Sequence, residues 1–296
     1  MTRAYRLLAG VLAAGALVLT GCAESVDPIE RLGRKAAHKA GETAHHREAH
    51  SSESADRQDA RGEQLASAAA HRRWGLTEPL APPPKPPARA EHGSRPGAHG
   101  GLPQVVDRVP TKDKVVFLTF DDGAERDPRF VRMVRELRLP VSMFLTDSVA
   151  GPGYAHFGRL RAVGATVQNH TLDHPYLPGL SYAGQRWEIC GQQDKLQQRF
   201  GIRPTLFRPP YGEYNADTLR AAAECGIRSL VTWRASMQIN DLRYAEGDGL
   251  RPGDIILAHF RGPDELHGTS LTEMTTRMLR HIQSQGYTVA RLEDYL

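Results

Sequence analysis

The chain has 296 residues, a formal net charge of +4 and an isoelectric point of about 9.0. This positive excess is modest for the length and is spread without a basic stripe or an aromatic platform, so composition disfavours nucleic-acid binding. The length would allow one large domain or two small ones, but only the second part of the chain has the hydrophobic periodicity of a folded domain.

The N-terminus has the pattern of an export signal. Arg3 and Arg6 precede an apolar run at 7–19 that is too short to span a membrane as a helix. We therefore predict a signal peptide over residues 1–21 and a mature protein outside the cytoplasm. Cys22 follows Leu-Thr-Gly and resembles the diacylated cysteine of bacterial lipoproteins, which implies a lipid anchor in a membrane. The alternative is a soluble secreted protein whose Cys22 carries no lipid.

Residues 22–111 show almost no hydrophobic periodicity and are rich in Ala, His, Arg and Pro. Such a segment cannot bury enough apolar surface to offset the entropy of ordering it, so we predict a disordered tether. The proline run at 82–87 would make part of it stiff and extended. A basic tether could favour anionic lipid headgroups or wall polymers, and an ordinary solvated linker is the alternative.

Residues 112–296 alternate short apolar runs with segments of helical character. Strands are predicted at residues 115–120, 141–145, 165–168, 205–207, 229–233, 254–258 and 288–292. Helices are predicted at residues 128–137, 181–200, 215–225 and 272–285, the second with Ser181 as N-cap and Gly201 after its end. This alternation indicates an α/β fold with a mostly parallel sheet, and we predict a distorted (β/α) barrel of about seven parallel strands.

Two cysteines remain in the folded part, Cys190 and Cys225. In an oxidising compartment they could pair as a disulfide. Two separate buried thiols are the alternative, because the sequence does not show whether the two side chains face each other.

Polar residues follow several of the predicted strands, at the edge where parallel barrels place their chemistry. Asp121 and Asp122 end the first strand, and adjacent side chains on an extended chain diverge, so one could bind a metal while the other faces substrate. Asp-Asp-Gly is also an ordinary turn. His170 and His174 are four residues apart, which on a helical turn lets both imidazoles reach one ion.

Two further strand ends carry candidate residues. Arg208-Pro-Pro-Tyr211-Gly212 is a rigid loop that could present a guanidinium and a backbone N–H at constant geometry, although a plain turn is the alternative. His259 ends an apolar strand, where a lone histidine is usually structural.

Taken together, Thr119 to Gly123, His170 to His174, Arg208 to Gly212 and Leu257 to His259 resemble the polysaccharide deacetylase family, carbohydrate esterase family four. The resemblance covers essentially the whole folded part and implies a distorted (β/α) barrel. It also implies a ligand set for one divalent ion, zinc in many relatives and cobalt or another metal in some, made of Asp122, His170 and His174.

The resemblance implies roles for the remaining motif residues as well. Asp121 would be the base that takes the proton of the attacking water, kept ionised by Arg208. The backbone N–H of Tyr211 would stabilise the oxyanion, and His259 would protonate the departing amine.

One segment departs from the family pattern. Ser236 stands where relatives often carry an Asp that pairs with the orienting arginine, and Leu242 follows Asp241 where a tryptophan lines the sugar pocket. This departure leaves open how Arg208 is oriented and what shape the sugar-binding groove has. Asp241 or Asp254 could substitute for the missing carboxylate.

We predict a metal-dependent hydrolase that removes N-acetyl groups from a cell-wall or extracellular polysaccharide, such as peptidoglycan or a chitin-like glycan. An O-acetyl polysaccharide esterase is the alternative within the same chemistry. A noncatalytic glycan-binding lipoprotein on the same fold is the alternative from another class. We expect a monomer whose partners are the polysaccharide and the membrane.

Overall fold

The computed structural model describes residues 69–86 and 101–296. The predicted signal peptide, the lipidation residue Cys22 and most of the predicted tether lie outside the described residues. Within the described ranges, no helix has both the length and the apolar character needed to cross a membrane.

The described residues contain one curled, mostly parallel sheet of ten strands. The strands are β1 (Gln104–Val106), β2 (Val115–Asp122), β3 (Val141–Leu145), β4 (Thr166–Asn169), β5 (Leu206–Phe207), β6 (Ser229–Val231), β7 (Ala235–Met237), β8 (Leu242–Tyr244), β9 (Ile255–His259) and β10 (Thr288–Ala290). Their order is β1-β6-β5-β4-β3-β2-β9-β7-β8, with β10 paired to β2. This arrangement confirms the predicted α/β fold and the distorted barrel.

Strand β2 is the centre of the sheet because it pairs in parallel with β3, β9 and β10. Its sequence, Val-Val-Phe-Leu-Thr-Phe-Asp-Asp, is buried at every position except the last, which explains the continuous apolar run in place of an alternating pattern. Consequently Asp121 and Asp122 lie at the end of a strand that is buried along almost its whole length.

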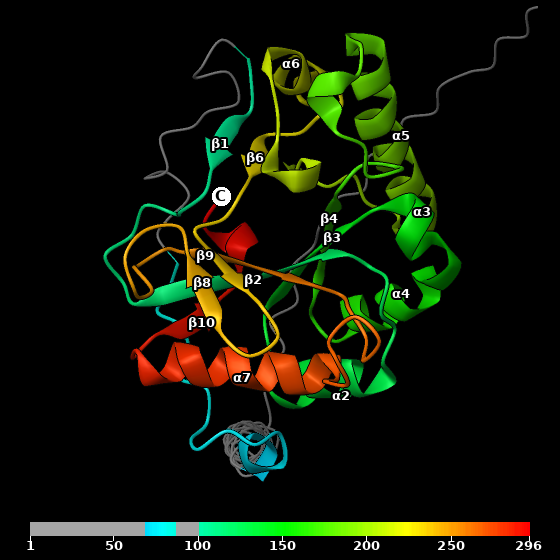
Figure 1. Ribbon diagram of the computed structural model, residues 1–296. Coiled ribbons are helices and arrows are strands. Elements are labelled where there is room, and N and C mark those ends of the chain that lie inside the picture. Colours follow the sequence, from blue (N-terminus) through cyan, green and yellow to red (C-terminus); the bar gives the residue numbers. More distant parts are fainter. Residues whose placement is uncertain (1–68, 87–100) are drawn as a thin grey trace, which may run out of the picture. The chain divides into compact units, whose positions relative to one another are not determined.

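Helices cover the outside of the sheet, and α7 and α2 lie side by side along one edge (Figure 1). The α-helices are α2 (Pro128–Glu136), α3 (Asp147–Ala150), α4 (Tyr154–Ala162), α5 (Tyr182–Phe200), α6 (Ala216–Glu224) and α7 (Leu271–Ser284). Short 3-10 turns are η1 (Gly151–Gly153), η2 (Leu177–Gly179), η3 (Pro210–Gly212) and η4 (Leu292–Asp294).

The sequence gives clear start and stop signals for the long helices. Ser181 caps α5 by accepting a hydrogen bond from the Gly184 N–H, and the left-handed Gly201 ends the helix. Ser270 and Glu273 form a reciprocal capping box at the start of α7. The four predicted helices are therefore confirmed to within a residue or so at each end.

The prediction that the tether extends to residue 111 is wrong for the part that the structure describes. Residues 69–73 are helical, and the side chains of Trp74 and Leu76 are buried in the main hydrophobic core. Strand β1 joins the sheet beside β6. A short apolar patch anchored on a large ring can add to a core without any periodic pattern, so the composition of the segment concealed it.

Two further features differ from the sequence prediction. Strands β7 and β8 form an antiparallel hairpin at the end of the sheet, between the predicted strands at 229–233 and 254–258, where we predicted no strand. The region between β3 and β4 contains α3 and α4, which the sequence did not indicate. The question of the cysteines is also settled, because Cys190 on α5 and Cys225 at the end of α6 form a disulfide.

Candidate metal centre

Four sequence motifs meet at the carboxyl ends of the parallel strands. Asp121 and Asp122 end β2, and His259 ends β9 as the register neighbour of Asp121 on the adjacent strand. His170 follows β4 directly, and Arg208 follows β5. These five residues, all predicted for the site, therefore lie along one edge of the sheet.

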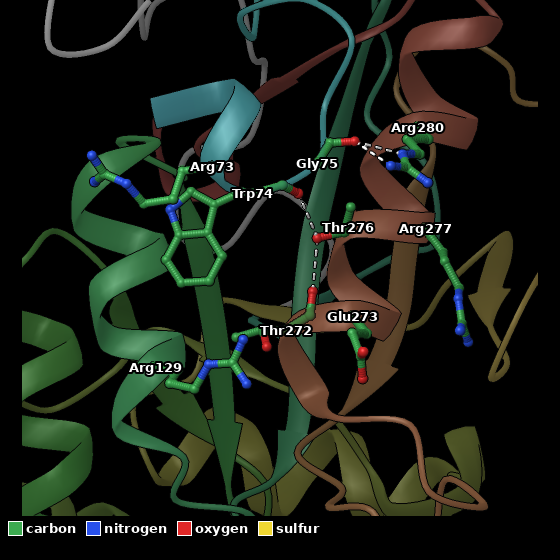
Figure 2. A pocket seen from close by; sticks show the side chains of 9 residues that line it. All are labelled: Arg73, Trp74, Gly75, Arg129, Thr272, Glu273, Thr276, Arg277 and Arg280. Carbon is green, nitrogen blue, oxygen red and sulfur yellow. Dashed lines mark hydrogen bonds between the residues drawn. The ribbon is translucent and has the colours of Figure 1, made fainter. Parts of the chain in front are cut away.

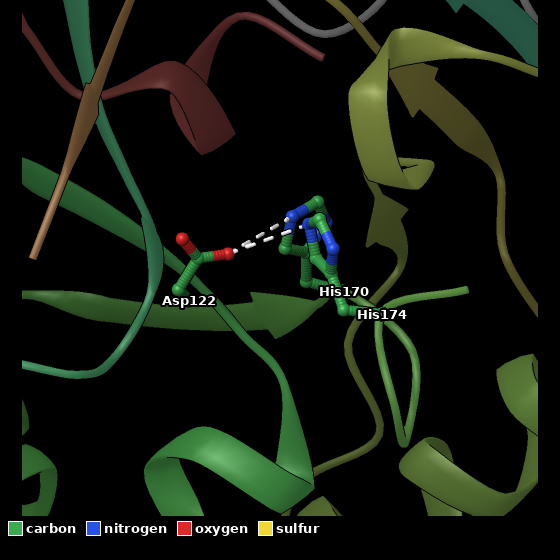
Figure 3. Close-up of side chains that lie close together, drawn as sticks. All are labelled: Asp122, His170 and His174. Carbon is green, nitrogen blue, oxygen red and sulfur yellow. Dashed lines mark ion pairs between the residues drawn. The ribbon is translucent and has the colours of Figure 1, made fainter. Parts of the chain in front are cut away.

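Asp122, His170 and His174 face one another across a small space (Figure 3). The Oδ1 atom of Asp122 lies 3.6 Å from Nε2 of His170 and 3.5 Å from Nε2 of His174. These distances are too long for hydrogen bonds. They match the spacing of about 3.4 Å between two ligand atoms that bind one tetrahedral zinc ion at 2.0–2.1 Å.

The unpaired atoms of this group fit a metal ion. Asp122 Oδ1 is buried and has no hydrogen-bond partner among the described residues. Nδ1 of His170 lies 2.7 Å from the carbonyl oxygen of Arg208, which can only accept, so Nδ1 carries the proton and the lone pair of Nε2 faces Asp122. One carboxylate and two imidazoles are common ligands of zinc and similar divalent ions.

Burial keeps His170 in the neutral form that a ligand needs. Its imidazole is almost fully buried, and this burial lowers its pKa to about 3. Burial also raises the pKa of Asp122, and the neighbouring Asp121 carboxylate adds to that rise. Two carboxylates this close together are stabilised in their charged forms by a cation.

The segment that carries the two histidines is an irregular loop, so the predicted helical turn is wrong. Thr171 and His174 both have positive φ, 72° and 57° respectively, a conformation that side chains rarely adopt. Glu188 on α5 supports this loop by accepting hydrogen bonds from the N–H groups of Leu172 and Asp173 at 3.1 Å and 2.9 Å. Sequence reasoning missed Glu188, because nothing in its helix marks it as a polar residue that points inward.

Arg208 is completely buried, and its guanidinium binds Asp121 directly. The Nη1 atom donates to Asp121 Oδ1 at 2.7 Å and to the hydroxyl of Thr119 at 2.8 Å. Further hydrogen bonds go to the carbonyl oxygens of Val231 and Thr232. Burial raises the pKa of Asp121, and the charge of Arg208 opposes that rise.

Asp121 therefore has one oxygen in use and one available. Oδ1 is held by Arg208, and Oδ2 lies 3.6 Å from Nε2 of His170, beside the three candidate metal ligands. A carboxylate held in this way can accept a proton from a molecule placed between it and the histidines.

His259 lies on the same edge as Asp121. Burial lowers the pKa of His259 to about 4, and the charge of Asp121 opposes the lowering. The imidazole is therefore neutral at pH 7 and must first gain a proton if it is to act as an acid.

The loop after β5 forms another part of the rim. Tyr211 has a positive φ of 62° and a side chain that is 60% exposed, and its ring meets the His174 ring edge-on at 4.8 Å between centroids. At Gly212, where φ is also positive, an added Cβ would lie 3.0 Å from the Trp233 ring. The ring of Trp233 also lies over the guanidinium of Arg208 at 5.6 Å.

The segment that departs from the family pattern provides no carboxylate for Arg208. Ser236 lies on β7 and accepts a hydrogen bond from Gln238, while Asp254 is bound to Arg108 at 2.6 Å. Asp241 is exposed, and Leu242 is buried. Arg208 is instead fixed by Asp121, Thr119 and main-chain carbonyls, so its orientation does not depend on this segment.

A model of a family described as polysaccharide deacetylase matches residues 108–230. The chain is 57% identical over 197 residues to an uncharacterized protein of Streptomyces coelicolor, a match that covers 66% of this chain and 78% of the relative. It is 23% identical to a peptidoglycan-N-acetylglucosamine deacetylase of Bacillus cereus, covering 65% of this chain and 92% of the relative. It is 33% identical to a bifunctional xylanase/xylan deacetylase of Cellvibrio japonicus, covering 42% of this chain but 19% of that longer protein.

Solved structures share the fold. A chitin deacetylase of Colletotrichum lindemuthianum superposes with a TM-score of 0.55 at 19% identity, covering 66% of this chain and 92% of that one. A CE4 family pseudoenzyme of Bacillus anthracis superposes with a TM-score of 0.54 at 19% identity, covering 65% and 69% of the two chains.

Proposed function

Because the chain belongs to the polysaccharide deacetylase family, we propose that it is an active, metal-dependent hydrolase that removes N-acetyl groups from a glycan. The observation that carries the proposal is that two adjacent carboxylates at the end of β2, those of Asp121 and Asp122, have different partners. Asp122 faces two imidazoles with an oxygen that has no partner within the described ranges, and Asp121 is held beside it by Arg208.

Asp122, His170 and His174 would hold one divalent ion, with zinc favoured by the mixed oxygen and nitrogen donors. When bound, such an ion supplies a Lewis acid that lowers the pKa of water and polarises the acetyl carbonyl. Asp121 would accept the proton of the attacking water on Oδ2, while Arg208 keeps Oδ1 in place.

His259 and Tyr211 would complete the reaction. The proton that Asp121 takes from water must reach the departing amine, and His259, the register neighbour of Asp121, is the group placed to carry it. Because free His259 is neutral, it acts by taking up this proton and then releasing it. The backbone N–H of Tyr211 would stabilise the charge that develops on the acetyl oxygen.

We propose peptidoglycan as the substrate, because a related deacetylase of Bacillus cereus is named for it and because the proposed export signal would bring the protein to the wall. The same signal, with Cys22 after Leu-Thr-Gly, supports a lipid anchor in a membrane outside the cytoplasm. Replacing Cys22 by Ser should release the protein from the membrane fraction, and unchanged sedimentation with membranes would contradict the anchor.

Two other functions have specific support. The relative in Cellvibrio japonicus carries a xylan deacetylase, which favours removal of O-acetyl groups as a second candidate. A pseudoenzyme of the same fold exists in Bacillus anthracis, which keeps a noncatalytic glycan-binding role as a third.

One assay separates the three. The purified protein, with residues 69–86 retained because they contribute to the core, is loaded with zinc or cobalt and incubated with N-acetylated oligosaccharides or O-acetylated xylan. We expect acetate from the N-acetylated substrate. Acetate from xylan alone would favour the esterase, and binding without acetate release would favour the noncatalytic role.

A further inference from the structure

Arg261 lies two residues beyond His259, at the edge of the sheet that carries the metal centre. The backbone is held firmly there. The N–H of Phe260 donates to the carbonyl oxygen of Asp121 at 3.1 Å, and the N–H of Glu125 donates to the carbonyl oxygen of Phe260 at 3.0 Å. The side chain of Phe260 is completely buried in the main hydrophobic core. The fold therefore fixes the backbone of Arg261 beside the loop that follows β2.

The side chain of Arg261 is exposed and weakly engaged. Its Nε atom lies 3.8 Å from Oε1 of Glu265, beyond hydrogen-bond reach, and the two side chains are 45% and 54% exposed. An exposed pair of this kind contributes little to stability. By contrast, Arg280, beside the pocket between α2 and α7, is fixed by donating to the carbonyl oxygen of Gly75 at 2.7 Å (Figure 2). Arg261 can therefore exchange its protein partner for a ligand.

The positive charge of Arg261 acts on two groups of the metal centre. Burial raises the pKa of Asp122, and Arg261 is one of the charges that oppose this rise. Burial lowers the pKa of His259 to about 4, and the charge of Arg261 adds to this lowering. The guanidinium is therefore within electrostatic reach of a candidate metal ligand and of the candidate acid.

The carboxylates of the edge do not need this cation. Asp121 is already paired with Arg208 at 2.7 Å. A divalent ion bound by Asp122 and the two histidines would more than neutralise the remaining carboxylate. The acetamido group and the hydroxyls of a sugar are neutral, so the proposed hydrolysis gives no use for a further positive charge. Such a charge beside a binding site instead attracts an anionic ligand.

The strand order separates Arg261 from the exposed ring of Tyr211. Tyr211 follows β5 and Arg261 follows β9, with β4, β3 and β2 between them in the sheet. The side chain of Tyr211 is 60% exposed and offers the face of its ring to a ligand. A glycan chain that crosses the metal centre along this edge would therefore meet a ring on one side and a cation on the other.

We propose that Arg261 binds a carboxylate carried by the glycan, so that the protein prefers acidic N-acetylated sugars to neutral ones. The inference rests on the proposed function, because the sugar at the metal centre must hold the carboxylate in place. A guanidinium and a carboxylate can form two parallel hydrogen bonds, which are stronger than the 3.8 Å contact with Glu265. Muramic acid units of peptidoglycan carry such a carboxylate on the carbon next to the acetamido group, through a lactyl ether, and chitin carries none.

The test compares an N-acetylated muramic acid–glucosamine disaccharide, with its lactyl carboxylate ionised, and the methyl ester of the same disaccharide. Binding to the zinc-loaded full chain is measured by calorimetry in an Asp121→Asn background, so that the sugar stays intact. We expect the acid to bind about tenfold more tightly than the ester. Arg261→Gln should remove most of this preference. Arg261→Lys keeps the charge without the parallel hydrogen bonds and should retain part of it.

Arg251→Gln is the matched control. Arg251 is also about half exposed and paired with a glutamate, Glu246, but it precedes β9 and so lies towards the opposite end of that strand. This variant should keep the preference for the acid within about twofold. Glu265→Gln removes the carboxylate that competes for Arg261, so the acid should bind more tightly than it does to the parent.

Three results would overturn the role of Arg261: equal binding of acid and ester, equal loss of the preference in Arg261→Gln and Arg251→Gln, or no binding of either sugar. The proposed function is judged separately, by acetate release from the protein with Asp121 intact. Acetate release without a preference for the acid would leave the proposed function standing and refute the role of Arg261. A preference for the acid that depends on Arg261, without acetate release from any glycan, would do the reverse.

Discussion

The metal-centre edge consists of the carboxyl ends of β2, β4, β5 and β9, and the flank consists of α5 and α6. The two regions differ in how their buried polar groups are paired. On the flank, most of the buried polar groups are paired: Ser181 and Asn215 cap the two helices, and buried Gln193 donates to the carbonyl oxygens of Pro204 and Cys225, while Oε1 of Gln192 has no partner among the described residues. At the edge, Asp122 Oδ1 has no partner in the described part of the chain, and Asp122 itself has a positive φ of 73°.

The paired polar groups of the flank stabilise the fold, whereas the unpaired carboxylate oxygen of the edge is available to bind a ligand. Buried polar groups without partners and left-handed residues that are not glycine each cost free energy, on the order of 1–3 kcal/mol. Such costs persist where the surrounding structure holds the residues in place, and here Glu188 on the flank holds the loop that carries His174. The following changes are ordered from the largest expected effect to the smallest.

Asp121→Asn should greatly reduce hydrolysis while leaving the three metal ligands in place. The amide cannot accept the proton of water, so we expect acetate release to fall by a factor of about 100 to 10,000. Metal content should stay close to one ion per chain, because Asp121 is outside the ligand set. His174→Ala is the matched contrast and should lose metal and activity together. Equal metal loss in the two variants would contradict the division of roles between Asp121 and His174.

Arg208→Met should lower the free energy of unfolding more than the loss of an ion pair on the flank does. It leaves Asp121 buried without its cation, which costs about 3–5 kcal/mol of unfolding free energy. Arg203→Met removes an exposed pair with Asp194 and should cost at most about 1 kcal/mol. Urea unfolding at pH 7 compares the two. Adding Asp121→Asn to Arg208→Met should restore part of the lost stability, and a purely additive double variant would contradict the coupling.

Glu188→Gln tests whether the flank positions the loop of the edge. The loss of the carboxylate charge weakens the hydrogen bonds from the N–H groups of Leu172 and Asp173, next to the ligand His174. We expect metal affinity, measured by competition with a chelator, to fall roughly tenfold. Glu224→Gln, which alters an exposed pair with Arg186 on the flank, should leave metal affinity unchanged. The support role is refuted if both variants bind metal like the parent.

Replacing His156 should have the smallest effect, and this effect is on the free energy of unfolding at low pH. It is buried on α4, and burial lowers its pKa to about 4 from an ordinary value near 6.5. As the pH falls from 6.5 towards 4, the unfolded chain takes up a proton that the folded chain does not, so stability decreases. Allowing for partial solvent screening, we expect about 1 kcal/mol. In His156→Leu this part of the pH dependence should vanish, and an identical pH profile in the two proteins would contradict the assignment.

The paired flank was largely predictable from sequence, because its information is local. Ser181 and Gly201 mark the two ends of α5 in the sequence. The disulfide was not predictable, since its two cysteines meet only after α5 and α6 pack together.

At the edge, the residue types were predictable and their surroundings were not. The motifs identified Asp122, His170 and His174, but the positive φ of His174 and the support from Glu188 depend on contacts between distant segments. Likewise, the burial of Trp74 against the core arises from a few long-range contacts that leave no periodic pattern in the sequence.

The most direct test of the account is a crystal of the protein soaked in zinc, with anomalous scattering recorded on both sides of the zinc absorption edge. We expect one strong peak within bonding distance, about 2.0–2.2 Å, of Asp122 Oδ1, His170 Nε2 and His174 Nε2. A crystal with no peak between these three atoms, or with these side chains turned away from one another around a zinc bound elsewhere, would contradict it.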